Sequence, residues 1–88
     1  MTRTKIKFPP GVKNIEALEN YILIATFDNG IKKKYDLKPL LKDKNFEPLK
    51  DKKLFKKVKV DSGGYAIVWN DKTDLAESEL WTNGKIVE

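Results

Sequence analysis

Apolar and polar residues alternate in two parts of the chain, and each part is centred on a turn. In the clearer part, residues 21–37, two segments rich in β-branched and aromatic residues flank the sequence Asp28-Asn29-Gly30. Such a turn between alternating segments is the strongest local signal of a β-hairpin. We therefore predict a hairpin over residues 21–37.

The register of this hairpin follows from the side chains that each loop length would pair. A two-residue loop would pair Phe27 with Lys32 and mix apolar and charged groups on both faces. A three-residue loop with Gly30 in the left-handed region pairs Phe27 with Ile31 and collects the apolar groups on one face, interrupted only by Lys33. We predict this second register, whose other pairs are Leu23 with Tyr35 and Tyr21 with Leu37.

The second alternating part extends from residue 57 to residue 69. Val58 and Val60 alternate with lysines, and a turn containing Gly63-Gly64 leads into a second apolar run. We predict a hairpin that pairs Val60 with Tyr65 and Val58 with Ile67. This pairing directs the following residues to one face: Val58, Val60, Tyr65, Ile67 and Trp69.

Short helices are predicted between the hairpins. Asp36 is an N-cap residue type, and Pro39 lies where a first helical turn tolerates proline, so residues 38–42 are expected to form one or two helical turns. Asp51 is expected to cap a second short helix over residues 51–56. In the linker between them, Phe46 and Leu49 are expected to point inward.

A final helix is predicted after the second hairpin. Asp74 is expected to cap this helix over residues 75–82, and Asn83-Gly84 is expected to end it. Residues 85–88 then form either a last edge strand or a frayed end.

The pattern of residues 12–18 fits either a helix or a strand. Val12, Ile15 and Leu18 have helical spacing, whereas Ile15 and Ala17 alternate. A strand would complete a three-stranded meander, which is more stable than an isolated hairpin. The elements together predict an α+β fold: a small antiparallel sheet of two hairpins, a meander plus a second hairpin, with short helices on one face. Residues 1–10 are expected to form a flexible basic tail, and residues 11–88 a single domain.

Composition narrows the chemistry that this domain can perform. The chain has no cysteine and no histidine, so it lacks thiolate ligands, the commonest metal ligand and the commonest general base. We therefore predict a protein that is not an enzyme and has no metal or cofactor. Its longest apolar run is far shorter than the roughly 20 residues that span a bilayer, and its first residues are no secretory signal, so we expect a cytoplasmic protein.

Two sets of residues are candidates for binding. The net charge is +5, and all but one of the 18 basic residues are lysines. The candidate phosphate contacts are Lys32, Lys34, Lys57 and Lys59. The candidate partner surface is Ile22, Ile24 and Val68. A surface that stacks nucleic-acid bases would require aromatic residues among the lysines, but the aromatic residues lie at predicted core positions. We therefore favour a protein partner over nucleic acid. A homodimer through an edge strand is compatible with either.

Two aspartates have a functional and a structural interpretation. Asp36 and Asp74 each precede a leucine, and they could share a site for a metal or a partner. Each could instead cap a helix, a common role worth roughly 1 kcal/mol. We favour the capping interpretation for both.

The order and spacing of the apolar residues resembles the bacterial family catalogued as domain of unknown function 2442, over residues 12–81. The residues that carry the resemblance are Tyr21-x-Leu23-x-x-x-Phe27-x-x-Gly30, Asp36-Leu37-x-x-Leu40-Leu41, Phe46-x-x-Leu49, Phe55-x-x-Val58-x-Val60, Ile67-x-Trp69 and Asp74-Leu75. The resemblance implies a strand at residues 12–18 and a prokaryotic, cytoplasmic protein without an established activity. Lys72 replaces a glycine that is usual in this family, so the turn after Trp69 is expected to take another shape.

These observations predict a non-catalytic protein-interaction or regulatory accessory module. The resemblance adds that the partner is a neighbouring small protein, as in a toxin–antitoxin-like pair. The alternative is weak nucleic-acid binding through the lysine-rich faces.

Overall fold

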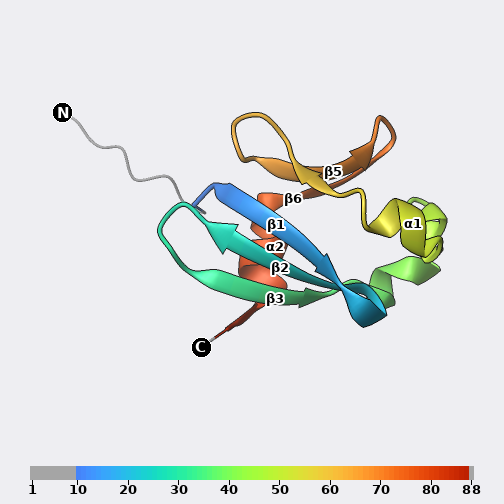
Figure 1. Ribbon diagram of the computed structural model, residues 1–88, viewed down its shortest axis with the longest axis horizontal. Helices are drawn as coiled ribbons and strands as arrows, with labels where there is room; N and C mark the ends of the chain where they lie inside the picture. Colours follow the sequence, from blue (N-terminus) through green and yellow to red (C-terminus); the bar gives the residue numbers. More distant parts are fainter. Residues whose placement is uncertain (1–9, 88) are drawn as a thin grey trace.

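A computed structural model describes residues 10–87 of the chain. It contains a four-stranded antiparallel sheet of order β1-β2-β3-β7 and a three-stranded antiparallel sheet of order β4-β5-β6 (Figure 1). The strands are β1 Val12–Leu18, β2 Ile22–Phe27, β3 Lys32–Asp36, β4 Lys59–Val60, β5 Ala66–Asn70, β6 Thr73–Ala76 and β7 Lys85–Ile86. The predicted α+β class is confirmed, and the two predicted hairpins lie in separate sheets. The predicted basic tail lies outside the described residues, apart from Pro10.

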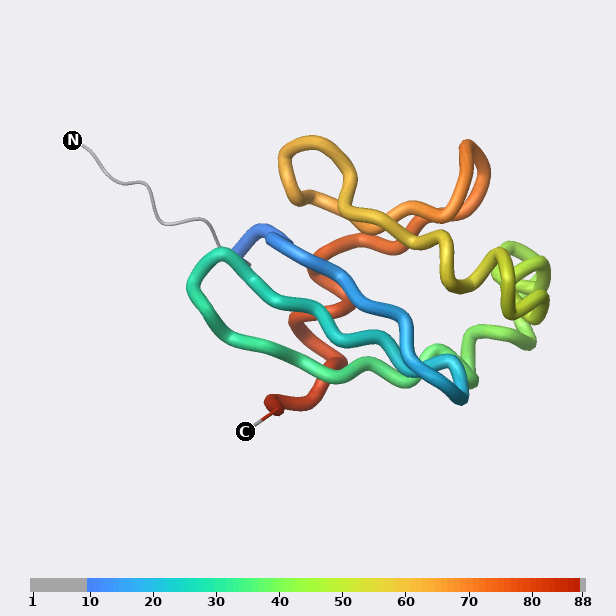
Figure 2. The backbone as a smooth tube through the Cα atoms, in the orientation of Figure 1, coloured from blue at the N-terminus to red at the C-terminus, as the bar shows by residue number. Residues whose placement is uncertain are grey.

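The helical segments are short. They are the 3-10 helices η1 Glu19–Tyr21, η2 Lys38–Lys42 and η3 Glu47–Lys50, and the α-helices α1 Lys52–Phe55 and α2 Glu77–Asn83. Figure 2 shows how the chain leaves the four-stranded sheet, makes its helical turns at one end of the molecule and returns through the three-stranded sheet to α2.

The first hairpin has the predicted register. Leu23 pairs with Tyr35, and the backbone N–H of Phe27 donates to Ile31 O over 2.8 Å. Gly30 has a φ of +89°, as a three-residue loop requires. Residues 12–18 form β1, which completes the predicted meander.

The core lies between the two sheets. Leu23, Phe27 and Ile67 are fully buried, and Trp69 donates a hydrogen bond from Nε1 to Phe55 O over 3.0 Å. α2 covers the inner face of the four-stranded sheet (Figure 1). Its Trp81 packs edge-on against Phe27, with ring centroids 5.1 Å apart. The buried residues of the core are Val12, Leu23, Ala25, Phe27, Tyr35, Leu37, Leu49, Phe55, Ile67, Trp69, Leu75 and Leu80.

Lys33 is the one charged residue predicted on the apolar face, and α2 accommodates it. Its Nζ lies 4.0 Å from the centroid of the Trp81 ring and donates a hydrogen bond to Trp81 O. Lys33 is half-buried, and its ammonium group has both a ring and a carbonyl as partners.

The predicted register of the second hairpin is wrong by two residues. Val60 pairs with Ile67 rather than with Tyr65, and Tyr65 is 60% exposed instead of facing the core. The cause is the loop: Gly63 and Gly64 both have positive φ, and Gly64 O accepts a hydrogen bond from Val12 N over 2.9 Å. This longer loop reaches β1, and a shift of two residues leaves the inward face of the strands unchanged.

The predicted start of the last helix is also wrong. Residues 73–76 form the edge strand β6, in which Asp74 pairs with Val68, and α2 begins after Ala76 without a side-chain cap. Thr73 and Leu75 are buried while Asp74 is exposed, so the alternation of a strand overrides the capping preference of the aspartate. Lys72 is not among the described residues with positive φ, so it does not adopt the left-handed conformation.

The other local predictions are confirmed. Asp51 accepts a hydrogen bond from Lys53 N over 2.9 Å and caps α1, and Leu49 is buried. α2 ends at Asn83, and residues 85–86 form the edge strand β7 beside β3.

Candidate functional site

One face of the four-stranded sheet points away from the core, and we call it the outer face. Its residues form three cross-strand rows: Leu18-Ile22-Asp36, Glu16-Ile24-Lys34-Lys85 and Asn14-Thr26-Lys32. In Figure 1 the sheet lies in front of α2, and none of the described elements covers this face. Leu18 is 38% exposed, and Ile22 and Ile24 are half-buried, so the centre of an uncovered sheet face is apolar.

The β3–β7 side of the outer face is basic, whereas the β1 side carries Glu16. Lys34 lies directly opposite Lys85, although like charges in this arrangement repel each other. Lys32, Lys34 and Lys85 make no ion pair with another described residue. Asp36 is already engaged by Lys38, whose Nζ lies 3.0 Å from Asp36 Oδ1. This basic side thus favours an acidic partner.

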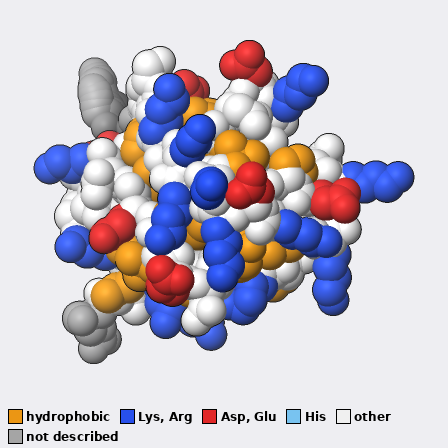
Figure 3. All heavy atoms as spheres, turned by 45° about the vertical axis from the view of Figure 1, so that its right-hand side comes forward, with side chains coloured by type: hydrophobic (Ala, Val, Ile, Leu, Met, Phe, Trp, Pro, Cys, Tyr) orange, Lys and Arg blue, Asp and Glu red, His pale blue; other side chains and the backbone are white. Residues whose placement is uncertain are grey.

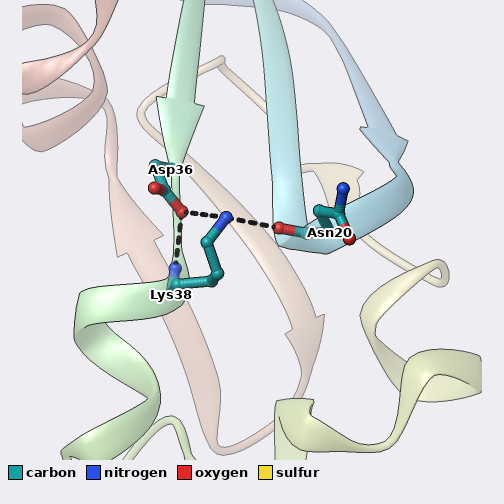
Figure 4. A network of polar contacts seen from close by, with 3 residues as sticks. All are labelled: Asn20, Asp36 and Lys38. Carbon is teal, nitrogen blue, oxygen red and sulfur yellow. Dashed lines mark hydrogen bonds and ion pairs between the residues drawn. The ribbon is translucent and has the colours of Figure 1, made fainter.

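The β1–β2 turn beside this face is held in an unusual conformation. Asn20 and Tyr21 both have a φ of +61°, which is uncommon for residues other than glycine. Lys38 holds the turn from the other side, because its Nζ donates to Asn20 O over 2.9 Å while it pairs with Asp36 (Figure 4). The backbone N–H of Lys38 also donates to Asp36 Oδ1, and this bond is the main cause that lowers the pKa of the Asp36 carboxyl.

A groove of about 310 Å³ lies between this turn and α1, and we call it the α1 groove. Its apolar walls include Leu18, Tyr21 and Phe55, and the rings of Tyr21 and Phe55 meet edge-to-face with centroids 5.1 Å apart. Its charged lining residues are Lys52, Lys53 and Lys56, together with Glu19, which pairs with Lys56. The groove therefore combines apolar walls with a net positive charge.

A second hollow, of about 600 Å³, lies where the β3 edge meets α2 and β7. Tyr35 and Asn83 both donate hydrogen bonds to Glu79 Oε2, each over 2.8 Å. Burial, and then the hydrogen bond to Glu79, raise the pKa of Tyr35. These three groups satisfy one another, which is typical of a structural cluster. Among residues 10–87, no group of three or more acidic side chains could hold a metal ion.

Comparison with known protein families identifies the family of this chain. A family model described as "Protein of unknown function (DUF2442)" matches residues 12–85. The chain belongs to this family. No curated protein and no solved structure matches significantly. The predicted resemblance is confirmed, and membership of this family assigns no activity.

The structure separates the predicted partner surface into two parts. Ile22 and Ile24 lie on the outer face together with Lys32 and Lys34. Val68 lies on the outside of the other sheet, where it pairs with Lys59. The remaining predicted phosphate contact, Lys57, is exposed between α1 and β4.

The two aspartates play different parts in this family member. Asp36 accepts a hydrogen bond from the backbone N–H of Lys38, the first residue of η2, but the N-cap position is occupied by Leu37, which provides no side-chain cap. Asp74 is a strand residue, and it lines a small third hollow with Asn45 and Phe46. The two side chains belong to different sheets and different hollows.

The α1 groove was not predicted from the sequence. Its two walls come from Tyr21 and Phe55, which are far apart in the chain and meet only through tertiary packing. Local pattern gives no signal for such a meeting, nor for the positive φ of Asn20 and Tyr21.

In the described chain, no helix has the length and hydropathy needed to cross a bilayer.

Proposed function

We propose that this chain is a non-catalytic protein-binding module, an accessory or regulatory domain whose partner packs on the outer face. The observation that carries the proposal is the row of Leu18 and Ile22, with Ile24 beside it, at the centre of an uncovered sheet face. A sheet usually buries one face and solvates the other, so a solvated face is expected to be polar. Apolar groups at its centre are typical of a binding surface.

The partner that fits this surface is a protein with an apolar centre and acidic residues around it. Such a partner would pair with Lys32, Lys34 and Lys85 and relieve the repulsion between the last two. The family resemblance supports a neighbouring small protein as the partner, as in a toxin–antitoxin-like or regulatory pair in the bacterial cytoplasm.

The test is a comparison of two charge insertions in the full chain. Ile24→Asp puts a carboxylate at the centre of the outer face, whereas Val68→Asp puts one on the outside of the other sheet, and circular dichroism verifies that both variants fold. We expect pull-downs from the native host to recover the same partner with the wild type and Val68→Asp, and to lose it with Ile24→Asp. Recovery of no partner, or of one that Ile24→Asp still binds, would refute the proposal.

A second candidate function is weak nucleic-acid binding through the lysines. The observation that favours it is that Lys32, Lys34 and Lys85 share the outer face. Three phosphate contacts would give a salt dependence of about −2 in log K against log salt for a single strand. A filter-binding titration with a single-stranded oligonucleotide at low salt measures this slope, and no binding would eliminate this function.

A further inference from the structure

We propose that the α1 groove receives one bulky apolar side chain of the partner, from a segment with acidic residues on both sides of that side chain. This inference rests on the proposed function, because it names the chemistry of the partner's contact. It concerns a second contact area, beyond the centre of the outer face.

The size and lining of the groove fit an aliphatic or aromatic side chain. A cavity of about 150 Å³ lined by Leu, Ile and Phe can hold a benzene molecule. The α1 groove has about twice that volume, and Tyr21 and Phe55 provide aromatic surface within it. Phe55 is only 2% exposed and forms part of the buried floor of the groove, whereas the more exposed Leu18 and Tyr21 offer the apolar surface that a ligand can contact.

The groove continues the outer face. Leu18, which is 38% exposed, lines the groove and also pairs with Ile22 on the outer face. Leu18 therefore connects the two areas, and a partner that packs over Ile22 and Ile24 can reach the groove across it. Continuity of this kind supports one partner for both areas.

The charges that line the groove determine what lies beside the apolar side chain. Lys52 and Lys53 make no ion pair with another described residue, and Lys56 pairs with Glu19 at 3.3 Å in an exposed bridge that contributes little. Figure 3, which brings the α1 side forward, shows basic side chains spread over this side, with fewer acidic side chains and exposed apolar side chains between them. Carboxylates that flank the inserted side chain would pair with these lysines.

The groove is formed before any partner arrives. Tyr21 is held by its ring contact with Phe55 and by a hydrogen bond from its hydroxyl to Lys50 O. Lys38 fixes the carbonyl of Asn20 in the same turn. Positive φ at two consecutive residues costs energy that the fold must offset, and such strain is concentrated at functional sites. A preformed groove lowers the entropy cost of binding.

Peptide probes test the inference directly. We would measure fluorescence anisotropy of a labelled peptide, Glu-Glu-Phe-Leu-Glu-Glu, with the full chain at low salt. Two matched peptides separate the contributions: one replaces Phe-Leu by Ala-Ala, and the other replaces every Glu by Lys. We expect the first peptide to bind at least about tenfold more tightly than either control, and its affinity to fall as salt rises.

Variants locate the binding site on the protein. The double variant Lys52→Glu, Lys53→Glu should weaken the binding of the acidic peptide by at least about tenfold. The control double variant Lys42→Glu, Lys44→Glu makes the same change in charge outside the groove. It should keep most of the wild-type affinity for the acidic peptide. Equal binding of the three peptides, or equal effects of the two double variants, would overturn the inference.

The two proposals fail in different ways. If Ile24→Asp loses the host partner but the double variant Lys52→Glu, Lys53→Glu still binds it, binding at the outer face is supported and the groove contact is refuted. If the peptide binds in the groove but no host protein depends on Ile24, the proposed function is refuted and the groove remains a peptide site.

Discussion

Positive φ has different consequences at different glycines. Gly64, with φ of +75°, is buried beside β1, and a Cβ atom built on it would lie 2.7 Å from Val12 O. Gly30, with φ of +89°, has no heavy atom within 4 Å of the same position. The backbone conformation is unfavourable for a side chain at both, but only Gly64 also lacks the space for one.

This difference predicts the cost of two matched substitutions. Gly30→Ala should lower the free energy of unfolding by about 1 kcal/mol, the cost of a left-handed non-glycine residue. Gly64→Ala should cost about 2 kcal/mol more, because the added methyl group must also displace the backbone of Val12. Urea unfolding of both variants measures the two costs. Equal losses would contradict the close approach of the β4–β5 loop to β1.

Tyr35 makes stability depend on pH at the alkaline end. Its hydroxyl donates to Glu79, and burial and this bond raise its pKa above the unfolded value of about 10. The unfolded chain therefore loses the proton first as pH rises. The stabilisation is complete below about pH 10 and is lost progressively above it.

The variant Tyr35→Phe tests this linkage. At pH 7 it should be less stable than the wild type by about 1 kcal/mol, the net value of a hydrogen bond. Above about pH 10 the difference should shrink, because only the wild type has this group to titrate. Urea unfolding of both proteins from pH 7 to pH 11 measures the difference, and a constant value would contradict the raised pKa.

At the scale of elements, the two hairpins show what local sequence can determine. The first register could be predicted because a single glycine, Gly30, fixes one loop length that also sorts the side chains by face. The second could not, because the loop at Gly63-Gly64 is set by its contact with Val12, more than fifty residues away in the sequence. The inward direction of Ile67 and Trp69 was still predicted correctly, since it depends only on alternation, whereas Tyr65 lies outside the strand and is exposed.

Helix starts show the same division between local and tertiary causes. Asp51 and Asp74 have equal capping preference, but only Asp51 accepts a hydrogen bond from the first turn of a helix. Asp51→Ala should therefore lower the free energy of unfolding by about 1 kcal/mol. Asp74→Ala should change it by less than about 0.5 kcal/mol, because its side chain is exposed on β6. Urea unfolding compares the two, and a larger loss at Asp74 would argue against β6.

The candidate site divides in the same way. The outward direction of Ile22 and Ile24 follows from alternation within one hairpin, so the sequence was sufficient to predict it. The separation of Val68 onto another sheet and the meeting of Tyr21 with Phe55 are tertiary features. A single sequence does not contain a local signal for either.

At the scale of the whole molecule, the two sheets depend on each other. The buried cluster takes Phe27 and Leu23 from one sheet and Ile67 and Trp69 from the other. Trp69 Nε1 also donates to Phe55 O, which ties the three-stranded sheet to α1. Neither sheet could separate without exposing its share of the core, and burial of that apolar surface is the main source of stability in a domain of this size.

We therefore propose that residues 11–88 unfold as one cooperative unit. The two tryptophans allow a test: Trp81→Phe leaves Trp69 to report on the three-stranded sheet, and Trp69→Phe leaves Trp81 to report on α2 and the four-stranded sheet. Within each variant, the urea midpoint of the remaining tryptophan's fluorescence should coincide with that of far-ultraviolet circular dichroism. Comparison within a variant removes the effect of the substitution on stability. If Trp69 fluorescence changed at lower urea than the circular dichroism, the three-stranded sheet would unfold by itself, and the shared core would not hold the sheets together.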